Sequence, residues 1–278
     1  MTTAPGQLFV VSTPIGNLGD FTFRAVEVLR GVAAILAEDT RHSRRLLDRY
    51  EIRTPVVAYH EHNEARTAPA LVERLRGGES LALISDAGTP LLSDPGARLV
   101  AAAAAAGVPV VPVPGASALL AALVASGLGA DRFTFYGFLP RKGGERAELL
   151  GEVARLGHLA VLYEAPGRVA DTLAELAATG GGERSAAVAR ELTKQFEEIR
   201  RGTVAELAAY YRDTAPRGEV VIVVGPAAAA APPSEDALRE RARALRAGGS
   251  SAKDAAATLV RETGVPRNLA YRLAQEAE

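Results

Sequence analysis

The chain has 278 residues, of which 48% are hydrophobic and 23% are charged, and its net charge is −1. This length suits two domains, or two domains and a small appendage, in an ordinary folded protein. The near-neutral charge gives no global basic field that would indicate nucleic acid, although a local basic surface stays open. The chain has no cysteine, which excludes disulfides, thiolate zinc sites and cysteine nucleophiles and suits a reducing compartment.

The N-terminal residues lack the charged segment followed by an apolar core that is typical of a signal peptide. No run of about 18 apolar residues is free of charges and of Gly or Pro breaks, so we expect no membrane-spanning helix. The sequence therefore predicts a soluble, cytoplasmic protein with no membrane partner.

The first half of the chain alternates short apolar runs with helical patterns. Strands are predicted over residues 8–12, 33–37, 56–59, 81–85 and 108–113, and helices over 24–30, 43–50, 65–76 and 97–106. Strict alternation of strands and helices indicates parallel βαβ units. The strands are continuously apolar, as expected where helices cover both faces of the sheet.

The second half has a different rhythm, with strands predicted over residues 133–138, 159–163, 186–189, 198–203 and 219–224. Residues 192–197 form a short link between two of these strands, which predicts an antiparallel pair within a mixed sheet. A Pro- and Gly-containing break near residues 113–117 separates the halves. We therefore predict domains over residues 1–115 and 116–226, both of the α/β class.

A third, helical piece is predicted over residues 234–278, after an alanine- and proline-rich linker. Ser251 and Asp254 form a capping-box pattern at the start of one helix, which would end before Gly264. Pro266 suits the first turn of a final helix, and the pair resembles a helix-turn-helix. Its arginines, Arg261, Arg267 and Arg272, either contact phosphate or form solvated helix faces.

The segment SDAGTPLLSDPG, residues 85–96, has the strongest functional pattern. An apolar strand delivers Asp86 at its tip, and Gly88 lets a ligand approach the backbone. The segment contains no Lys or Arg, so its composition favours a cationic or neutral ligand over a phosphate. The alternative is a structural turn with Asx caps. Asp94 is predicted to cap the following helix.

Several other strand ends carry polar residues at the edge where open α/β sheets bind ligands. Residues 12–17 match no known phosphate-binding fingerprint, and Ser117 is a predicted helix cap. Residues 60–64 contain an HxH pattern, which we interpret as a hydrogen-bonding loop and not as a metal site. Two basic segments are candidates for RNA backbone contacts. Their residues are Arg41, Arg44, Arg45, Arg141, Lys142 and Arg146.

Seven of these segments occur together in an order that resembles a known family. They are STPIGNLGD, AEDTRHSRRLL, SDAGTPLLSDPG, PVPGASA, FYGFLPRKGGER, LYEAP and ARELTKQFEE. The chain resembles the small-subunit ribosomal RNA methyltransferase I family, in the tetrapyrrole-methylase fold superfamily, over essentially its whole length. One departure is Gly167, where the family usually has His.

The resemblance implies S-adenosylmethionine-dependent 2′-O-methylation of a cytidine ribose in the decoding region of 16S ribosomal RNA. It implies a two-domain tetrapyrrole-methylase-like fold, a cofactor cleft between the domains, the 16S RNA or the small ribosomal subunit as partner, and a homodimer. The implied cofactor-binding residues are Pro14, Ile15, Asp86, Ala87, Gly88, Thr89, Ser117, Ala118, Tyr163, Glu164, Ala165, Ala189, Arg190, Glu219 and Val220.

Methyl transfer to a hydroxyl can be helped by a general base. The candidates, left unranked, are Asp39, His42, Glu164 and Glu191. Two other functions stay open: a methylase acting on a small-molecule tetrapyrrole, and a nucleic-acid-binding regulator built on the C-terminal helices.

Overall fold

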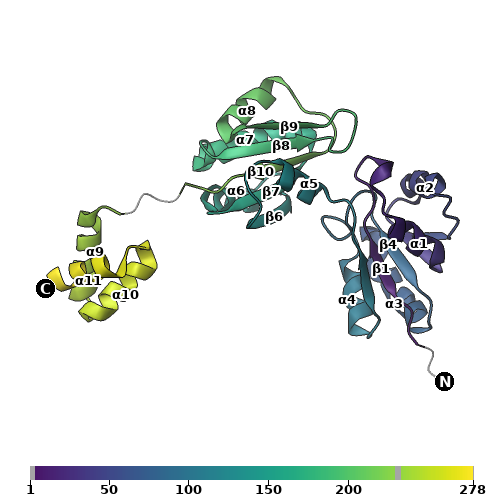
Figure 1. The fold of residues 1–278 in the computed structure, drawn as a ribbon, viewed down its shortest axis with the longest axis horizontal. Helices are drawn as coiled ribbons and strands as arrows, with labels where there is room; N and C mark the ends of the chain where they lie inside the picture. Colours follow the sequence, from purple (N-terminus) through teal and green to yellow (C-terminus); the bar gives the residue numbers. More distant parts are fainter. Residues whose placement is uncertain (1–3, 229–232, 278) are drawn as a thin grey trace. The chain divides into compact units, whose positions relative to one another are not determined.

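The structure is a computed structural model that describes residues 4–228 and 233–277. The chain divides between residues 227 and 228 into two compact units, which are described separately (Figure 1). The first unit contains two five-stranded sheets, and the second contains helices only. Within the described ranges, no helix combines the length and the apolar character needed to cross a bilayer.

The first sheet is wholly parallel and has the strand order β3-β2-β4-β1-β5. Its strands are β1 (Leu8–Val11), β2 (Ala34–Ala37), β3 (Val56–Ala58), β4 (Leu81–Ile84) and β5 (Val110–Val113). Because β1, β2 and β4 are neighbours and run in the same direction, the segments that follow them meet at one edge of the sheet.

Helices cover both faces of this sheet. They are α1 (Phe23–Gly31), α2 (Thr40–Arg49), α3 (Glu61–Arg76) and α4 (Ala97–Ala105), with a short turn, η1 (Leu18–Asp20). Apolar residues of α3 and α4 pack on one face, around Leu36 and Leu83. Those of α1 and α2 pack on the other face, around Ile35 and Ile84. Burial on both faces explains the continuously apolar strands.

The second sheet is mixed and has the strand order β6-β7-β10-β8-β9. Its strands are β6 (Phe133–Phe138), β7 (Leu159–Glu164), β8 (Ser185–Arg190), β9 (Glu198–Thr203) and β10 (Val220–Val224). Strands β6 and β7 are parallel, and the other three pairs are antiparallel. The predicted antiparallel pairing of residues 186–189 with 198–203 is confirmed.

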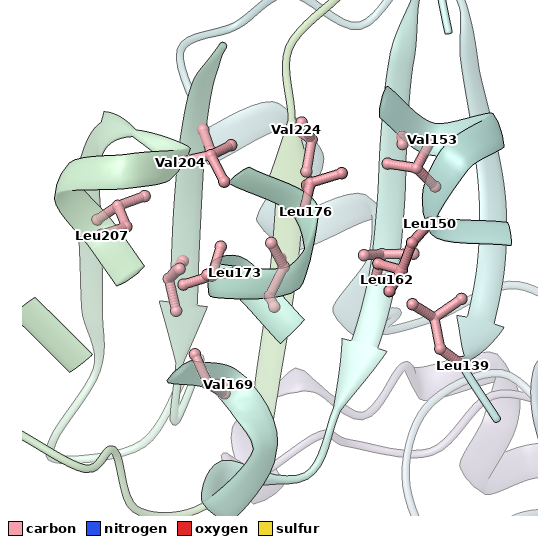
Figure 2. Packing of buried hydrophobic residues seen from close by; sticks show 14 of the residues in the cluster. Leu139, Leu150, Val153, Leu162, Val169, Leu173, Leu176, Val204, Leu207 and Val224 are labelled. Carbon is pink, nitrogen blue, oxygen red and sulfur yellow. The ribbon is translucent and has the colours of Figure 1, made fainter. Parts of the chain in front are cut away.

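This second sheet also has two covered faces. Helices α6 (Gly144–Arg155), α7 (Val169–Leu176) and α8 (Val204–Asp213) bury one face in a core that includes Leu162 and Val224 (Figure 2). Helix α5 (Ala118–Ala125) packs on the opposite face, against Val161 and Val223. Two short turns, η2 (Pro166–Arg168) and η3 (Ala177–Gly181), flank α7.

The C-terminal unit is formed by α9 (Glu235–Ala247), α10 (Ala252–Thr263) and α11 (Arg267–Glu276) around its own apolar core. Ser251 caps α10 by accepting a hydrogen bond from the Asp254 N–H, and Gly264 ends it in the left-handed conformation. The predicted helix pair is confirmed, while α9 is a helix that the sequence reading did not include.

The α/β fold class predicted from the sequence is confirmed, and most element bounds agree within two residues. The main differences are at helix starts. Helix α2 begins at Thr40 because Asp39 caps it, and α3 begins at Glu61, where Asn63 Oδ1 accepts a hydrogen bond from the His60 N–H. The domain boundary between residues 115 and 116 stays a prediction.

Candidate active site

A cavity of about 430 Å³ lies where the edge of the first sheet meets the second sheet. The first sheet contributes the segments after β1, β2 and β4. The second contributes the end of β7 and the start of β10, which are adjacent because these strands are antiparallel. The lining residues are Ile15, Glu38, Asp86, Ala87, Gly88, Thr89, Leu92, Ser93, Asp94, Ala118, Phe138, Tyr163, Glu164, Ala165, Pro166, Gly218, Glu219, Val220 and Val221.

Hydrogen bonds between the loops after β1 and β4 fix one wall of the cavity. The Thr13 N–H donates to the Gly88 carbonyl at 2.8 Å, and the Gly88 N–H donates to the Thr13 carbonyl at 3.1 Å. Gly88 has φ +81°, and a Cβ there would lie 3.3 Å from Cγ2 of Ile15. A glycine therefore suits both the backbone conformation and the close approach of the two loops.

The lining is acidic. It includes five carboxylates and no Lys or Arg; the acids are Glu38, Asp86, Asp94, Glu164 and Glu219. Asp86 links two strand ends, because its Oδ1 accepts a hydrogen bond of 3.1 Å from the Asp39 N–H. A cavity of this size with a negative wall favours a small cationic ligand over a phosphorylated one.

Two of these acids hold protons more tightly than usual. Burial raises the pKa of Asp94 to about 6, and repulsion from Asp86 acts in the same direction against the hydrogen bond from Ser85. Burial also raises the pKa of Glu38, followed by repulsion from Asp94 and Asp86. The prediction that Asp94 caps the next helix is wrong, because Gly96 is the N-cap residue of α4 and no side chain caps that helix.

Tyr163 joins the cavity to α5. Its hydroxyl accepts a hydrogen bond of 3.2 Å from the Leu119 N–H in the first turn of that helix. Its ring lies 4.8 Å from the Phe135 ring and 5.6 Å from the Phe138 ring, measured between centroids. Phe138 is 56% exposed, so an aromatic surface stands open at this side of the site.

Glu164 is completely buried, and its carboxylate is held by several donors. Oε1 accepts the Ala165 N–H at 2.9 Å and lies 3.3 Å from Nε of Arg168, and Oε2 accepts from Thr172 Oγ1 at 2.6 Å. Arg146 donates in turn to Thr172 Oγ1 at 3.0 Å. These partners occupy the carboxylate and hold it in one orientation.

The other three candidate bases lie outside the cavity. Asp39 caps α2, and hydrogen bonds from the Arg41 and His42 N–H groups lower its pKa. Glu191 pairs with Lys194 at 2.9 Å, which lowers its pKa. His42 lines a second hollow of about 180 Å³ beside the first.

Most of the cofactor-binding residues predicted from the resemblance line the cavity. They are Ile15, Asp86, Ala87, Gly88, Thr89, Ala118, Tyr163, Glu164, Ala165, Glu219 and Val220. Four others do not: Pro14 lines the second hollow, Ser117 caps α5, Ala189 is buried in the sheet, and Arg190 pairs with Glu198 at 2.8 Å.

Eight lining residues were absent from the predicted set: Glu38, Leu92, Ser93, Asp94, Phe138, Pro166, Gly218 and Val221. Glu38 directly follows β2, so the strand-end rule that selected Asp86 also applies to it. Gly218 precedes the predicted residue Glu219. The remaining positions depend on how two loops and two sheets come together.

The candidate RNA contacts fall into two classes. Arg41, Arg44, Arg45, Arg141 and Lys142 are exposed. Arg146 is only 5% exposed, and its guanidinium contacts Glu175, Thr172 and the Pro140 carbonyl. In this arrangement Arg146 cannot reach RNA, and the structure gives it a role inside the fold instead.

No metal site is indicated by the described residues, because none of their His, Cys, Asp or Glu side chains form a group of three or more suited to an ion. The HxH segment is the start of α3, where the His60 N–H donates to Asn63 Oδ1 at 2.9 Å.

Comparisons with known proteins agree with this architecture. The family model of tetrapyrrole (corrin/porphyrin) methylases matches residues 7–208. Two proteins called ribosomal RNA small subunit methyltransferase I are similar over nearly their full lengths. The one from Synechocystis sp. is 47% identical over 98% of this chain and 99% of its own. The one from Pseudomonas aeruginosa is 48% identical over 98% of both chains.

Solved structures show the same fold at low identity. Diphthine synthase superposes with a TM-score of 0.63 and 15% identity, over 79% of this chain and 89% of that one. The uroporphyrin-III C-methyltransferase of Thermus thermophilus, complexed with S-adenyl homocysteine, superposes with a TM-score of 0.58 and 22% identity, over 79% and 97%.

Proposed function

The chain belongs to the tetrapyrrole methylase family and, within it, to the ribosomal RNA small subunit methyltransferase I family, and we propose that it methylates the ribose 2′-oxygen of a cytidine in the decoding region of 16S ribosomal RNA. The chain is an S-adenosylmethionine-dependent methyltransferase. The similarity to RNA methyltransferases over nearly the whole chain supports the choice of substrate, and the acidic cavity at the edge of the parallel sheet supports the cofactor site.

The cavity suits this cofactor in size and charge. A volume of about 430 Å³ is in the range of small-molecule sites. The cofactor carries a positive sulfonium. Of the lining carboxylates, Glu164 is paired with Arg168 and Glu219 with Lys194, whereas Glu38, Asp86 and Asp94 form no ion pair with the described residues. Bound there, it supplies an activated methyl group. We assign Asp86 and the backbone from Ala87 to Thr89 to one wall, and Tyr163 to Ala165 with Glu219 and Val220 to the other.

The protein's main contribution to the reaction is positioning, which in well-oriented systems is worth about 7–11 kcal/mol. A base near the acceptor hydroxyl adds to it. We propose Asp94 for this role, because its raised pKa lies near the operating pH and its carboxylate lines the cavity. Glu164 orients the site, since its carboxylate is already engaged by Thr172 and the Ala165 N–H.

The proposed RNA contacts are the exposed cations that follow two strands. Arg41, Arg44 and Arg45 belong to α2, which begins three residues after β2. Arg141 and Lys142 lie in the loop after β6. Phosphate contacts of this kind orient an RNA substrate without reading its sequence.

The decisive experiment is to map ribose methylation in 16S RNA after incubation with S-adenosylmethionine, with and without the protein. A single new 2′-O-methylcytidine in the decoding region is the expected result. Both naked 16S RNA and assembled small subunits should be offered. Methylation of a tetrapyrrole in place of both RNA substrates would overturn the proposal in favour of a small-molecule methylase.

The regulator alternative is tested by removing residues 234–278. A methyltransferase without these residues would still bind S-adenosylhomocysteine in a calorimetric titration. A regulator built on the C-terminal helices would show no such binding.

We also propose a cytoplasmic homodimer. Leu120 and Val124 support it, since they lie one turn apart on α5 and are 51% and 72% exposed. Light scattering of the Val124→Lys variant should then report a monomer.

A further inference from the structure

The C-terminal unit has a surface hollow of about 560 Å³ between α10 and α11. Its polar lining consists of Lys253, Arg267, Asn268, Tyr271, Arg272 and Gln275, and alanines of α10 complete it. All six polar side chains are exposed. The hollow contains three cations and no carboxylate, so an anionic ligand complements it.

This hollow is a groove between the two helices, and its cations form fewer ion pairs than the arginines of α9. On α9, Arg239 pairs with Glu235 at 2.9 Å, and Arg241 pairs with Glu262 at 2.8 Å. Within the described ranges, neither Lys253 nor Arg267 forms an ion pair. Arg272 is 3.2 Å from Glu235, but this pair is half exposed and of little energetic weight.

The groove face of α11 also carries an open aromatic ring. Asn268, Tyr271 and Gln275 follow at helical spacing, so they lie on one face, while Leu273 and Ala274 are buried on the other. Tyr271 is 46% exposed. An exposed ring flanked by cations and amide groups can stack an unpaired base while its phosphates meet the cations.

We propose that this groove is a binding site for single-stranded RNA, separate from the acidic cavity of the first unit. The inference rests on the proposed function only in the choice of RNA over DNA. Tyr271 stacks a base, Lys253 and Arg267 bind phosphates, and Asn268 and Gln275 supply hydrogen bonds.

The test measures equilibrium binding by the full chain of a fluorescent 12-nucleotide RNA of mixed sequence, at several salt concentrations and without cofactor. The double variant Lys253→Gln/Arg267→Gln should reduce the salt slope, d log K/d log[salt], by about 1.4, or 0.7 for each lost phosphate contact. The control Arg243→Gln/Arg261→Gln removes two charges from the same unit outside the groove and should leave the slope unchanged. Equal slopes for both variants would refute the site.

Tyr271 provides an independent readout. Tyr271→Ala should weaken RNA binding about tenfold without altering the salt slope, whereas Tyr271→Phe should bind like the wild type. If Tyr271→Ala lost affinity only for an RNA duplex of the same length, and not for the single strand, the groove would be a duplex-binding site and the proposal would be wrong. Calorimetric affinity for S-adenosylhomocysteine should be unchanged in all variants. Because these readouts need no turnover, failure to methylate RNA would count against the proposed function and not against the groove.

Discussion

Oγ1 of Thr172 donates a hydrogen bond of 2.6 Å to Oε2 of Glu164, whose side chain is completely buried at the wall of the cavity. The same Thr172 oxygen accepts a hydrogen bond from Arg146, which also donates to the Pro140 carbonyl. Arg168 reaches Pro140 too and lies 3.3 Å from Glu164. The start of the basic loop after β6 and the cavity carboxylate therefore share one set of hydrogen-bond donors.

Replacing Thr172 by Val should destabilise the protein and loosen Glu164. The variant keeps the shape of the side chain but removes a hydrogen bond to a buried charge, which is worth about 1.5–3 kcal/mol. Urea unfolding should show a loss of this size, with a lower affinity for S-adenosylhomocysteine. Thr172→Ser keeps the hydroxyl and serves as the control. If Val and Ser variants were equally stable, the hydrogen bond to Glu164 would have no energetic role.

The basic loop gives a second prediction, because its cations have separated roles. Arg141→Gln/Lys142→Gln should lower RNA affinity and reduce the salt slope by about 1.4, with unchanged unfolding free energy, because both side chains are exposed. Arg146→Gln should show the opposite pattern. It removes a buried guanidinium that donates to Thr172 and to the Pro140 carbonyl, while its ion-pair partner Glu175 is half exposed, so we expect a loss of about 1–3 kcal/mol in stability. A stable Arg146→Gln protein with reduced RNA affinity would restore Arg146 to the RNA-binding set.

The difference between Arg146 and its neighbours shows where sequence reading stops. Both kinds of residue occur in one basic, glycine-containing segment, which favours an exposed loop. In the structure α6 begins at Gly144, and the helix turns Arg146 inward. Its partners Thr172 and Glu175 lie 26 and 29 residues away in the chain. No local sequence pattern predicts a contact between residues that lie so far apart in the chain.

The lining of the acidic cavity can also be predicted only in part from the sequence. Asp86 and Glu38 each follow an apolar strand of a parallel sheet, so the strand-end rule places them at one edge. Asp94 reaches the cavity through a loop in which Leu91 and Ser93 have φ of +75° and +70°. Residues other than glycine rarely adopt such angles, so the sequence supports a turn but not this path. In the sequence Asp94 lies farther than Asp86 from the strand tip, which favours a helix cap over a place in the cavity.

The raised pKa of Asp94 predicts how stability depends on pH. Its pKa is about 6 in the folded protein and about 4 in an unfolded chain. Below about pH 4 the carboxyl is protonated in both the folded and the unfolded chain, so it does not lower the free energy of unfolding. As the pH rises through 6, the stability that depends on the protonated group is lost. With solvent screening, the change is on the order of 1–2 kcal/mol. The difference in unfolding free energy between the wild type and Asp94→Asn, measured at pH 4 and at pH 8, should show most of this change.

Cofactor binding should respond to pH in the opposite direction. Ionised Asp94 attracts a sulfonium, so affinity for S-adenosylmethionine should rise between pH 5 and pH 7.5. Asp94→Asn should flatten this rise and weaken binding at pH 7.5 by about 5–10-fold, or ~1–1.4 kcal/mol. S-adenosylhomocysteine lacks the sulfonium and serves as the matched ligand, with little effect expected. Equal pH profiles for the two ligands would show that Asp94 does not face the sulfonium.

Gly218, at the start of the strand segment that lines the cavity, supplies the last prediction. It has φ +81°, and a Cβ there would lie 1.9 Å from Oε1 of Glu191. That oxygen also accepts the Glu219 N–H at 3.2 Å and pairs with Lys194 at 2.9 Å. Gly218→Ala should therefore displace Glu191, lower stability by about 1–3 kcal/mol and weaken cofactor binding.

The control for this prediction is Gly129→Ala. Gly129 has a similar φ of +90°, but nothing lies within 4 Å of its added Cβ. The two variants share the backbone strain and differ in the collision, so the difference in their unfolding free energies isolates the contact with Glu191. Calorimetry should show weaker S-adenosylhomocysteine binding for Gly218→Ala alone. Equal losses in both variants would mean that backbone strain, and not the position of Glu191, determines the effect.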